Sequence, residues 1–290
     1  MADQADKLRN LFRAKQEKIH LEKKENTRII TVASGKGGVG KTSLTVNLAI
    51  ALSKAGKKVL VMDADLGMAN IDIMMGLAPK YTLYDFLNGQ KSFPEIVMQS
   101  FEGINVIPGC SGIFEADDIL RIHKEVLIKE LADYAREMDF VFIDTGAGIS
   151  QVVLGFIAAA DDAIIVITPE PTSITDGYGI IKVLSKFKLH KQAYLIVNMA
   201  NNLQEAQESA QRIEMVANSY LDIEIKRLGV IHFDNKVKQS IKEMTPFILK
   251  YPGSQAARDV TCIANNIVEH KIGFHTETNN FGQKLMNLLR

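Results

Sequence analysis

The sequence predicts an α/β fold: a single doubly wound domain in which helices cover both faces of a mostly parallel sheet. Three observations support this prediction. Continuous apolar runs rich in Val and Ile alternate with stretches of helical periodicity. Several of these runs end in an acidic or amide residue, as strands often do at the ligand-binding edge of a parallel sheet. A glycine-rich turn joins the first run to the first helical stretch.

The individual elements follow from this alternation. Strands are expected at 29–33, 58–63, 105–107, 140–144, 164–168, 194–198 and 228–231. Helices are expected at 43–55, 123–138, 173–187, 204–219 and 254–270. No repeat or linker interrupts 27–273, so we expect one domain there, with a polar lead-in at 1–26 and a tether and terminal helix at 274–290.

The turn at 35–42 reads GKGGVGKT and matches the phosphate-loop pattern G-x-x-x-x-G-K-[ST]. Its glycines let backbone N–H groups close on phosphate oxygens, and the following helix N-terminus adds partial positive charge. Lys41 is expected to reach the β- and γ-phosphates, and the Thr42 hydroxyl to hold Mg²⁺. The residues expected to surround the phosphates are Gly35, Lys36, Gly37, Gly38, Val39, Gly40, Lys41, Thr42 and Ser43.

A dinucleotide fingerprint is the rival interpretation of this turn. Gly35, Gly37 and Gly40 also satisfy G-x-G-x-x-G, and Asp63 lies about where the ribose-binding acid would fall. That fingerprint gives Lys41 and the residue after it no role, whereas a phosphate loop uses both. The phosphate loop is therefore favoured.

Two further strands end in carboxylates that could serve the same site. Asp144 ends an apolar strand and precedes TGAG, so it is a candidate Mg²⁺ ligand, with Gly146 close to the γ-phosphate; a helix-capping role is the alternative. Asp63 and Asp65 lie two apart in an extended chain and face the same side. One could support the metal and the other orient the attacking water, or both could be solvated or helix-capping turn acids.

Lys36 lies inside the same loop as Lys41. Two lysines would repel each other unless a polyanion separates them, and one site scarcely needs both. Lys36 is therefore expected to contact the nucleotide of a second subunit in trans; a solvent-exposed lysine is the alternative.

Both ends of the chain are open to two interpretations. Residues 1–26 carry only a thin apolar stripe, which favours a disordered lead-in over a helix that orders on a partner. Near the C-terminus, apolar residues at i, i+4, i+7 and i+8 form an amphipathic pattern, which could dock on the core or lie in a membrane interface. The residues on this apolar face are Phe281, Leu285, Met286, Leu288 and Leu289.

Composition narrows the function classes. The formal net charge is 0, so no global field draws the chain to nucleic acid. The two cysteines, Cys110 and Cys262, give neither a disulfide framework nor a metal-ligand spacing, and are expected to be buried. The first residues lack an apolar signal region and no apolar run could span a bilayer, so a cytoplasmic protein is expected.

With Lys36 beside Lys41, the chain resembles the deviant phosphate-loop ATPases of the MinD/ParA type. DADLGMANIDIMMG (63–76) and DTGAG (144–148) match the two switch regions of that family, and residues 231–247 resemble its last conserved loop and helix. The resemblance implies slow, Mg²⁺-dependent hydrolysis of ATP to ADP by a dimer that forms face to face around two ATP molecules. By this resemblance, Asp65 positions the attacking water and Lys36 contacts the nucleotide bound to the opposite subunit. Thr42 and Asp144 bind Mg²⁺, with Asp63 in support. Asn198 contacts the adenine, and the base pocket is lined by Ile231 and Phe233.

Within that family, both ends resemble the flagellar-number regulators called FlhG, YlxH or FleN. Their DQAxxLR motif is matched by Asp3, Gln4, Ala5, Leu8 and Arg9. The resemblance implies that this segment stimulates a signal-recognition-type GTPase, FlhF. It also implies that the C-terminal helix binds phospholipid reversibly at the inner face of the cell membrane, and that the protein meets flagellar C-ring proteins while regulating flagellar number or placement.

Other function classes remain to be compared with this one. A ParA-like partitioning ATPase that binds DNA non-specifically would need a basic surface, and the core has no dense Lys/Arg cluster, so no specific nucleic acid is expected. An iron–sulfur redox ATPase would need paired cysteines near the switches, which Cys110 and Cys262 do not supply. A scaffold that binds nucleotide without hydrolysing it would show no turnover.

Overall fold

The structure, a computed structural model, describes residues 27–65, 69–100, 102–109, 126–127 and 129–269. An eight-stranded sheet runs through these residues in the order β3-β4-β2-β5-β1-β6-β7-β8. Neighbouring strands pair in parallel except β3 and β4, which are antiparallel. The strands are β1 (Arg28–Ala33), β2 (Val59–Ala64), β3 (Met98–Gln99), β4 (Asn105–Ile107), β5 (Phe140–Thr145), β6 (Asp162–Ile167), β7 (Gln192–Ala200) and β8 (Glu224–His232).

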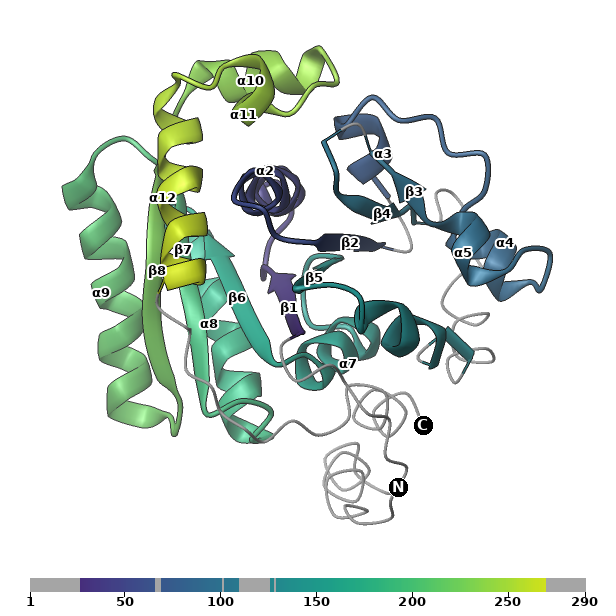
Figure 1. Cartoon of the computed structure of the whole chain (residues 1–290). Helices are drawn as coiled ribbons and strands as arrows, with labels where there is room; N and C mark the ends of the chain where they lie inside the picture. Colours follow the sequence, from purple (N-terminus) through teal and green to yellow (C-terminus); the bar gives the residue numbers. More distant parts are fainter. Residues whose placement is uncertain (1–26, 66–68, 101, 110–125, 128, 270–290) are drawn as a thin grey trace.

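Helices cover both faces of the sheet (Figure 1). The apolar sides of α2 (Lys41–Lys54), α11 (Phe247–Lys250) and α12 (Gln255–Glu269) form one core with the strands. On the other face, α7 (Gln151–Ala159), α8 (Pro171–Lys186) and α9 (Leu203–Tyr220) pack over β6 and β7. The smaller helices are α3 (Ile71–Met74), α4 (Leu83–Leu87), α5 (Phe93–Ile96) and α10 (Asn235–Lys242).

The central strands explain why the sequence folds in this way. Every residue of β2, β5 and β6 is buried, and β1 is buried after its first residue. Strands covered on both faces need apolar side chains throughout, which accounts for the continuous Val and Ile runs. The doubly wound parallel fold predicted from these runs is confirmed.

Several boundaries differ from the predicted ones for identifiable reasons. Helix α7 was not predicted, because it is buried along most of its length and shows no polar face to mark a helical period. Strand β3 is only two residues long, which is too short for a strand pattern to be recognised in the sequence. The helix predicted at 123–138 is described at 126–127 and 129–135, and it ends before 136. Strands β7 and β8 extend beyond the predicted runs into more polar positions.

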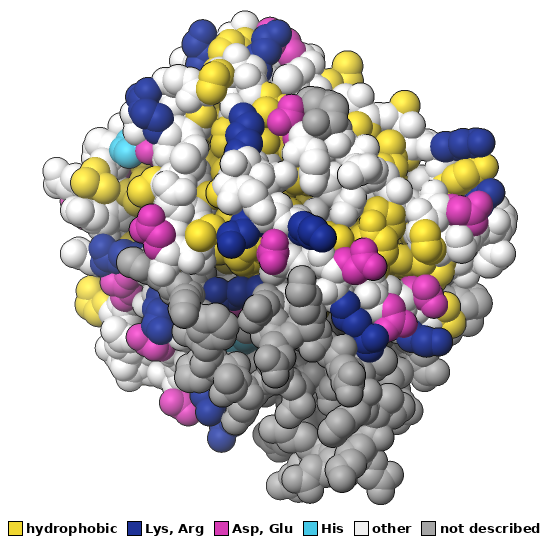
Figure 2. All heavy atoms as spheres, viewed as in Figure 1, with side chains coloured by type: hydrophobic (Ala, Val, Ile, Leu, Met, Phe, Trp, Pro, Cys, Tyr) yellow, Lys and Arg dark blue, Asp and Glu magenta, His cyan; other side chains and the backbone are white. Residues whose placement is uncertain are grey.

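The outer surface carries charges of both signs. On the face shown in Figure 2, described Lys and Arg side chains are interspersed with Asp and Glu. Cys262 is exposed, so the expectation of a buried thiol is wrong there, and Cys110 lies outside the described residues. Within the described part of the chain, no helix combines the length and apolar character needed to cross a membrane.

Candidate nucleotide site

The phosphate loop connects the end of β1 at Ala33 to the start of α2 at Lys41. Gly38 and Gly40 have φ of 79° and 84°, in the left-handed region that favours glycine. Gly40 is the N-cap of α2, and no side chain caps the first turn. The first N–H groups of a 14-residue helix therefore face the loop without a side-chain acceptor, as a phosphate-binding site requires.

Two of the loop glycines are fixed by close contacts with other elements. A Cβ on Gly35 would lie 2.4 Å from backbone atoms of Asp176 in α8, and a Cβ on Gly40 would lie 2.4 Å from Nδ2 of Asn198. A Cβ on Gly37 or Gly38 would meet nothing within 4 Å. The loop is thus clamped at both ends, and its middle faces open space where phosphates could enter.

Lys41 and Thr42 converge on the carboxylate of Asp144 at the end of β5. Lys41 Nζ lies 3.2 Å from Asp144 Oδ1, and the Thr42 hydroxyl donates to Oδ2 at 2.6 Å. Thr45, which the sequence analysis missed, donates to Oδ1 at 3.3 Å. Burial raises the pKa of Asp144, and the neighbouring Lys41 charge opposes that shift. The structure brings these residues together, and a buried carboxylate beside a hydroxyl is a donor set that suits Mg²⁺. Their role as metal ligands stays a prediction.

Asp63 lies beside Asp144, because the two occupy matching positions on the paired strands β2 and β5. Its carboxylate accepts the N–H groups of Asp65, Asn70 and Ile71 at 3.1, 2.9 and 3.1 Å, so it closes the turn that enters α3. Burial, assisted by the charge of Asp144, raises the pKa of Asp63 to about 7. Asp63 therefore makes the contacts expected of a helix-capping residue, and it does so next to the candidate metal site.

Asp65 and Gly146, predicted at the γ-phosphate, lie close together. A Cβ on Gly146 would sit 3.6 Å from Asp65 Oδ1. A missed residue, Gly109, packs against the same region, because a Cβ there would lie 3.1 Å from Asp63 Cγ. Close approaches of this kind leave no signal in a single sequence.

Lys36 extends toward the start of α8, and its side chain is 41% exposed. Its Nζ lies 2.8 Å from Glu170 Oε2 and 3.2 Å from the Thr172 hydroxyl. The sequence analysis identified neither partner, since both are more than 130 positions away along the chain. Within one chain, Lys36 is thus held by an exposed ion pair.

The residues predicted at the base lie at the ends of β7 and β8. Asn198 is buried and donates from Nδ2 to the Val39 carbonyl at 2.7 Å. Ile231 belongs to the apolar core, whereas Phe233 is 43% exposed, with Lys238 Nζ 5.1 Å from its ring centroid. Of these two residues, Phe233 offers the larger surface to a ligand.

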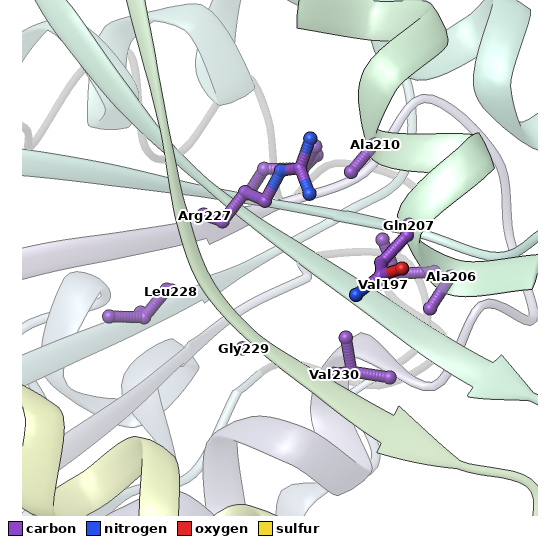
Figure 3. Close-up of a pocket in the computed structure, with 9 residues that line it drawn as sticks. Val197, Ala206, Gln207, Ala210, Arg227, Leu228, Gly229 and Val230 are labelled. Atoms are coloured by element: carbon purple, nitrogen blue, oxygen red, sulfur yellow. The ribbon is translucent and has the colours of Figure 1, made fainter. Parts of the chain in front are cut away.

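One cavity lies away from this site, and some predicted residues cannot be located in the described part of the chain. A cavity of about 100 Å³ between β7, β8 and α9 is lined by none of the predicted residues (Figure 3). The residues predicted to bind a partner or a membrane lie outside the described residues: Asp3, Gln4, Ala5, Leu8, Arg9, Phe281, Leu285, Met286, Leu288 and Leu289.

The chain is similar to a known family and to several known proteins. The AAA_31 family, described as an AAA domain, matches residues 27–203. The antiactivator FleN of Pseudomonas aeruginosa is 33% identical over 83% of this chain and 86% of its own length. The flagellum site-determining protein YlxH of Helicobacter pylori is 36% identical over 84% of this chain and 82% of its own length.

Among solved structures, the septum site-determining protein MinD from Pyrococcus horikoshii, complexed with Mg-ADP, superposes with a TM-score of 0.71. It is 30% identical in sequence, and the match covers 87% of this chain and 99% of that one. The matched family spans the phosphate loop and the strands β2 and β5, which carry Asp63 and Asp144. The chain therefore belongs to the AAA_31 family of P-loop ATPases and has the MinD/ParA-type fold.

Proposed function

We propose that this protein is a switch ATPase: ATP binding drives formation of a homodimer, and slow, Mg²⁺-dependent hydrolysis to ADP reverses it. The observation that carries the proposal is the convergence of Lys41 and Thr42 on buried Asp144, next to the uncapped start of α2. Among the described residues, no three His, Cys, Asp or Glu side chains cluster as a metal site. A metal bound through one carboxylate, one hydroxyl and the substrate phosphates fits that composition.

Each residue of the site has a role in this proposal. Thr42 and Asp144 hold Mg²⁺, which neutralises charge on the β- and γ-phosphates when bound. Lys41 exchanges its contact with Asp144 for the phosphates. Asp65 orients the attacking water beside Gly146, and Asp63 keeps the turn behind it in place. Lys36 leaves Glu170 and reaches the nucleotide of the partner subunit.

The cellular role in this proposal is regulation of flagellar number or placement. Two relatives carry names that point to it, an antiactivator and a flagellum site-determining protein. Residues 1–26 stimulate an FlhF-like GTPase through the motif that includes Gln4, and the protein meets flagellar C-ring proteins. The tether and helix at 274–290 bind phospholipid, which places the cytoplasmic protein reversibly at the inner face of the cell membrane.

Non-specific DNA binding by a partitioning ATPase is the competing proposal. It requires a surface rich in Lys and Arg. The face shown in Figure 2 mixes charges of both signs and so does not favour DNA binding. The apolar sequence pattern of residues 281–289 favours the membrane proposal.

Co-sedimentation with anionic liposomes tests the membrane switch. We expect pelleting with ATP, much less with ADP, and none after deletion of residues 276–290. A matched control replaces 276–290 by a Gly/Ser segment of equal length. Pelleting that is independent of nucleotide, or retained by the deletion, would contradict the proposal. If liposomes do not pellet the protein under any condition, binding to DNA over a salt series becomes the next measurement.

A further inference from the structure

The end of β7 is tied to the phosphate loop by one buried side chain. Asn198 donates from Nδ2 to the Val39 carbonyl at 2.7 Å, across 159 positions of sequence. Asn198 is 8% exposed and Val39 is 3% exposed, so this hydrogen bond is shielded from water. A shielded hydrogen bond whose acceptor has no water to replace the donor is costly to remove.

The orientation of the Asn198 amide is fixed by its neighbour. Its Oδ1 accepts the N–H of Met199 at 2.9 Å, so Nδ2 must be the atom that faces Val39. Met199 has a φ of 60°, in the left-handed region that a non-glycine residue rarely adopts. A strained backbone conformation persists only where surrounding contacts hold it, and the hydrogen bond from the Met199 N–H to Asn198 is one such contact.

The same amide also determines which residue the loop can carry before Lys41. A Cβ on Gly40 would lie 2.4 Å from Asn198 Nδ2 and 3.3 Å from Met199 Cε. The Val39 side chain is meanwhile packed in the apolar core. Val39 is thus held at its side chain by the core and at its carbonyl by Asn198, immediately before the glycine that turns the chain into α2.

We propose that Asn198 is a positioning residue: through the Val39 carbonyl it keeps the phosphate loop in its phosphate-binding shape before any nucleotide arrives. One N–H of the amide serves the loop, and the second remains for the adenine base. The same side chain therefore contacts the base and positions the loop that binds the phosphates. This inference rests on the proposed function, since it assumes that the loop binds ATP.

Inorganic tripolyphosphate separates the two roles, because it has phosphates but no base. We expect Asn198→Ala to weaken Mg²⁺-tripolyphosphate binding about tenfold, the effect of losing one buried hydrogen bond. ATP binding should weaken by at least that factor. Phe233 is expected to contact only the base, so Phe233→Ala should weaken ATP binding and leave tripolyphosphate binding unchanged. Competition with a fluorescent ATP analogue measures both affinities.

Hydrogen exchange on the nucleotide-free full chain gives a readout that a base contact would not move. Backbone amides of residues 38–41 should exchange at least threefold faster in Asn198→Ala than in the wild type or in Phe233→Ala. Asn198→Leu, which keeps the branched arrangement of four side-chain heavy atoms and has no donor, should behave likewise, and it replaces the alanine variant if that variant does not fold.

The outcomes are distinct. Weaker tripolyphosphate binding with faster loop exchange supports the positioning role. If the Asn198 variants weaken only ATP and leave loop exchange unchanged, the positioning role is overturned and Asn198 is a base contact alone. If the wild type binds neither ATP nor tripolyphosphate, the proposed function itself fails, and this inference fails with it.

Discussion

Lys36 Nζ lies 2.8 Å from Glu170 Oε2, at the N-cap of α8. The side chains of the pair are 41% and 64% exposed, so solvent screens their attraction. An ion pair of this kind contributes about 0.5 kcal/mol or less to stability. Lys36 can therefore leave Glu170 at small cost when a more strongly charged polyphosphate comes within reach.

Replacing Lys36 by Ala tests its contact in trans. Lys36→Ala should leave thermal stability and the affinity of the monomer for ATP within about twofold, because Lys41 still faces the phosphates. Dimers formed with a non-hydrolysable ATP analogue should disappear in light scattering. Lys91→Ala, which breaks the exposed pair with Glu95, serves as the matched control. Unchanged dimers of Lys36→Ala would contradict the trans contact.

Asp144→Asn should abolish turnover and also destabilise the nucleotide-free protein. The amide cannot balance the charge of buried Lys41, and an uncompensated buried charge costs about 3 kcal/mol. Turnover with Mg²⁺ should fall at least about 100-fold, since the metal loses its carboxylate ligand. Urea unfolding and phosphate release measure the two effects.

The control for Asp144→Asn is Asp133→Asn, which removes an exposed pair with Arg136. It should change neither quantity. EDTA should stop turnover in the wild type to the same extent as the Asp144 substitution. Turnover that survives either treatment would show that the candidate metal site does not carry the reaction.

Asp63 predicts a specific dependence of stability on pH. Its pKa is raised from 3.8 to about 7, chiefly by burial. Between these two pH values the folded protein holds a proton on Asp63 that the unfolded chain has released. The stabilisation of the folded state by this proton is therefore fully present below about pH 4 and is lost as pH rises through about 7. Asp63→Asn cannot titrate, so its stability relative to the wild type should improve from pH 5 to pH 8 by roughly 2 kcal/mol. Urea unfolding without nucleotide or Mg²⁺ measures this difference, and parallel pH profiles would contradict it.

The parts of this site that a sequence can predict are the local ones. The loop from Gly35 to Thr42 is a contiguous motif, and Asp144 follows an apolar strand directly, so both were recognisable from their neighbours. The contacts of Lys36 with Glu170 and of Asn198 with Val39 join residues more than 130 positions apart and depend on how α8 and β7 pack. No spacing rule links such residues.

Burial also hides information that the sequence analysis needed. Helix α7 is apolar on all sides, so no alternation of polar and apolar residues marks its helical period in the sequence. Asp63 and Asp65 look alike as carboxylates two residues apart. Only the fold shows that Asp63 accepts the N–H groups of Asn70 and Ile71, whereas Asp65 lies against Gly146.

Phe281→Glu tests the proposed membrane-binding segment at 281–289 without deleting it. A carboxylate on the apolar face opposes insertion into the interface, so ATP-dependent liposome flotation should be lost. Lys284→Glu, at a position outside the apolar face, makes a larger change in charge and should reduce flotation only on anionic liposomes. Retained flotation of Phe281→Glu on neutral lipids would make residues 281–289 a helix that packs on the protein.

Gln4→Ala tests the proposed partner contact. The side chain of Gln4 offers both a donor and an acceptor, which alanine removes without altering the charge of the segment. Stimulation of the FlhF-like GTPase should fall at least about tenfold, while the intrinsic ATPase rate, set by Lys41 and Asp144, should stay unchanged. Lys7 occupies a variable position of DQAxxLR, so the Lys7→Ala variant should stimulate the GTPase as the wild type does. If Gln4→Ala stimulates the GTPase fully, residues 1–26 are a lead-in without this role, because the motif is the only feature of that segment that points to a GTPase.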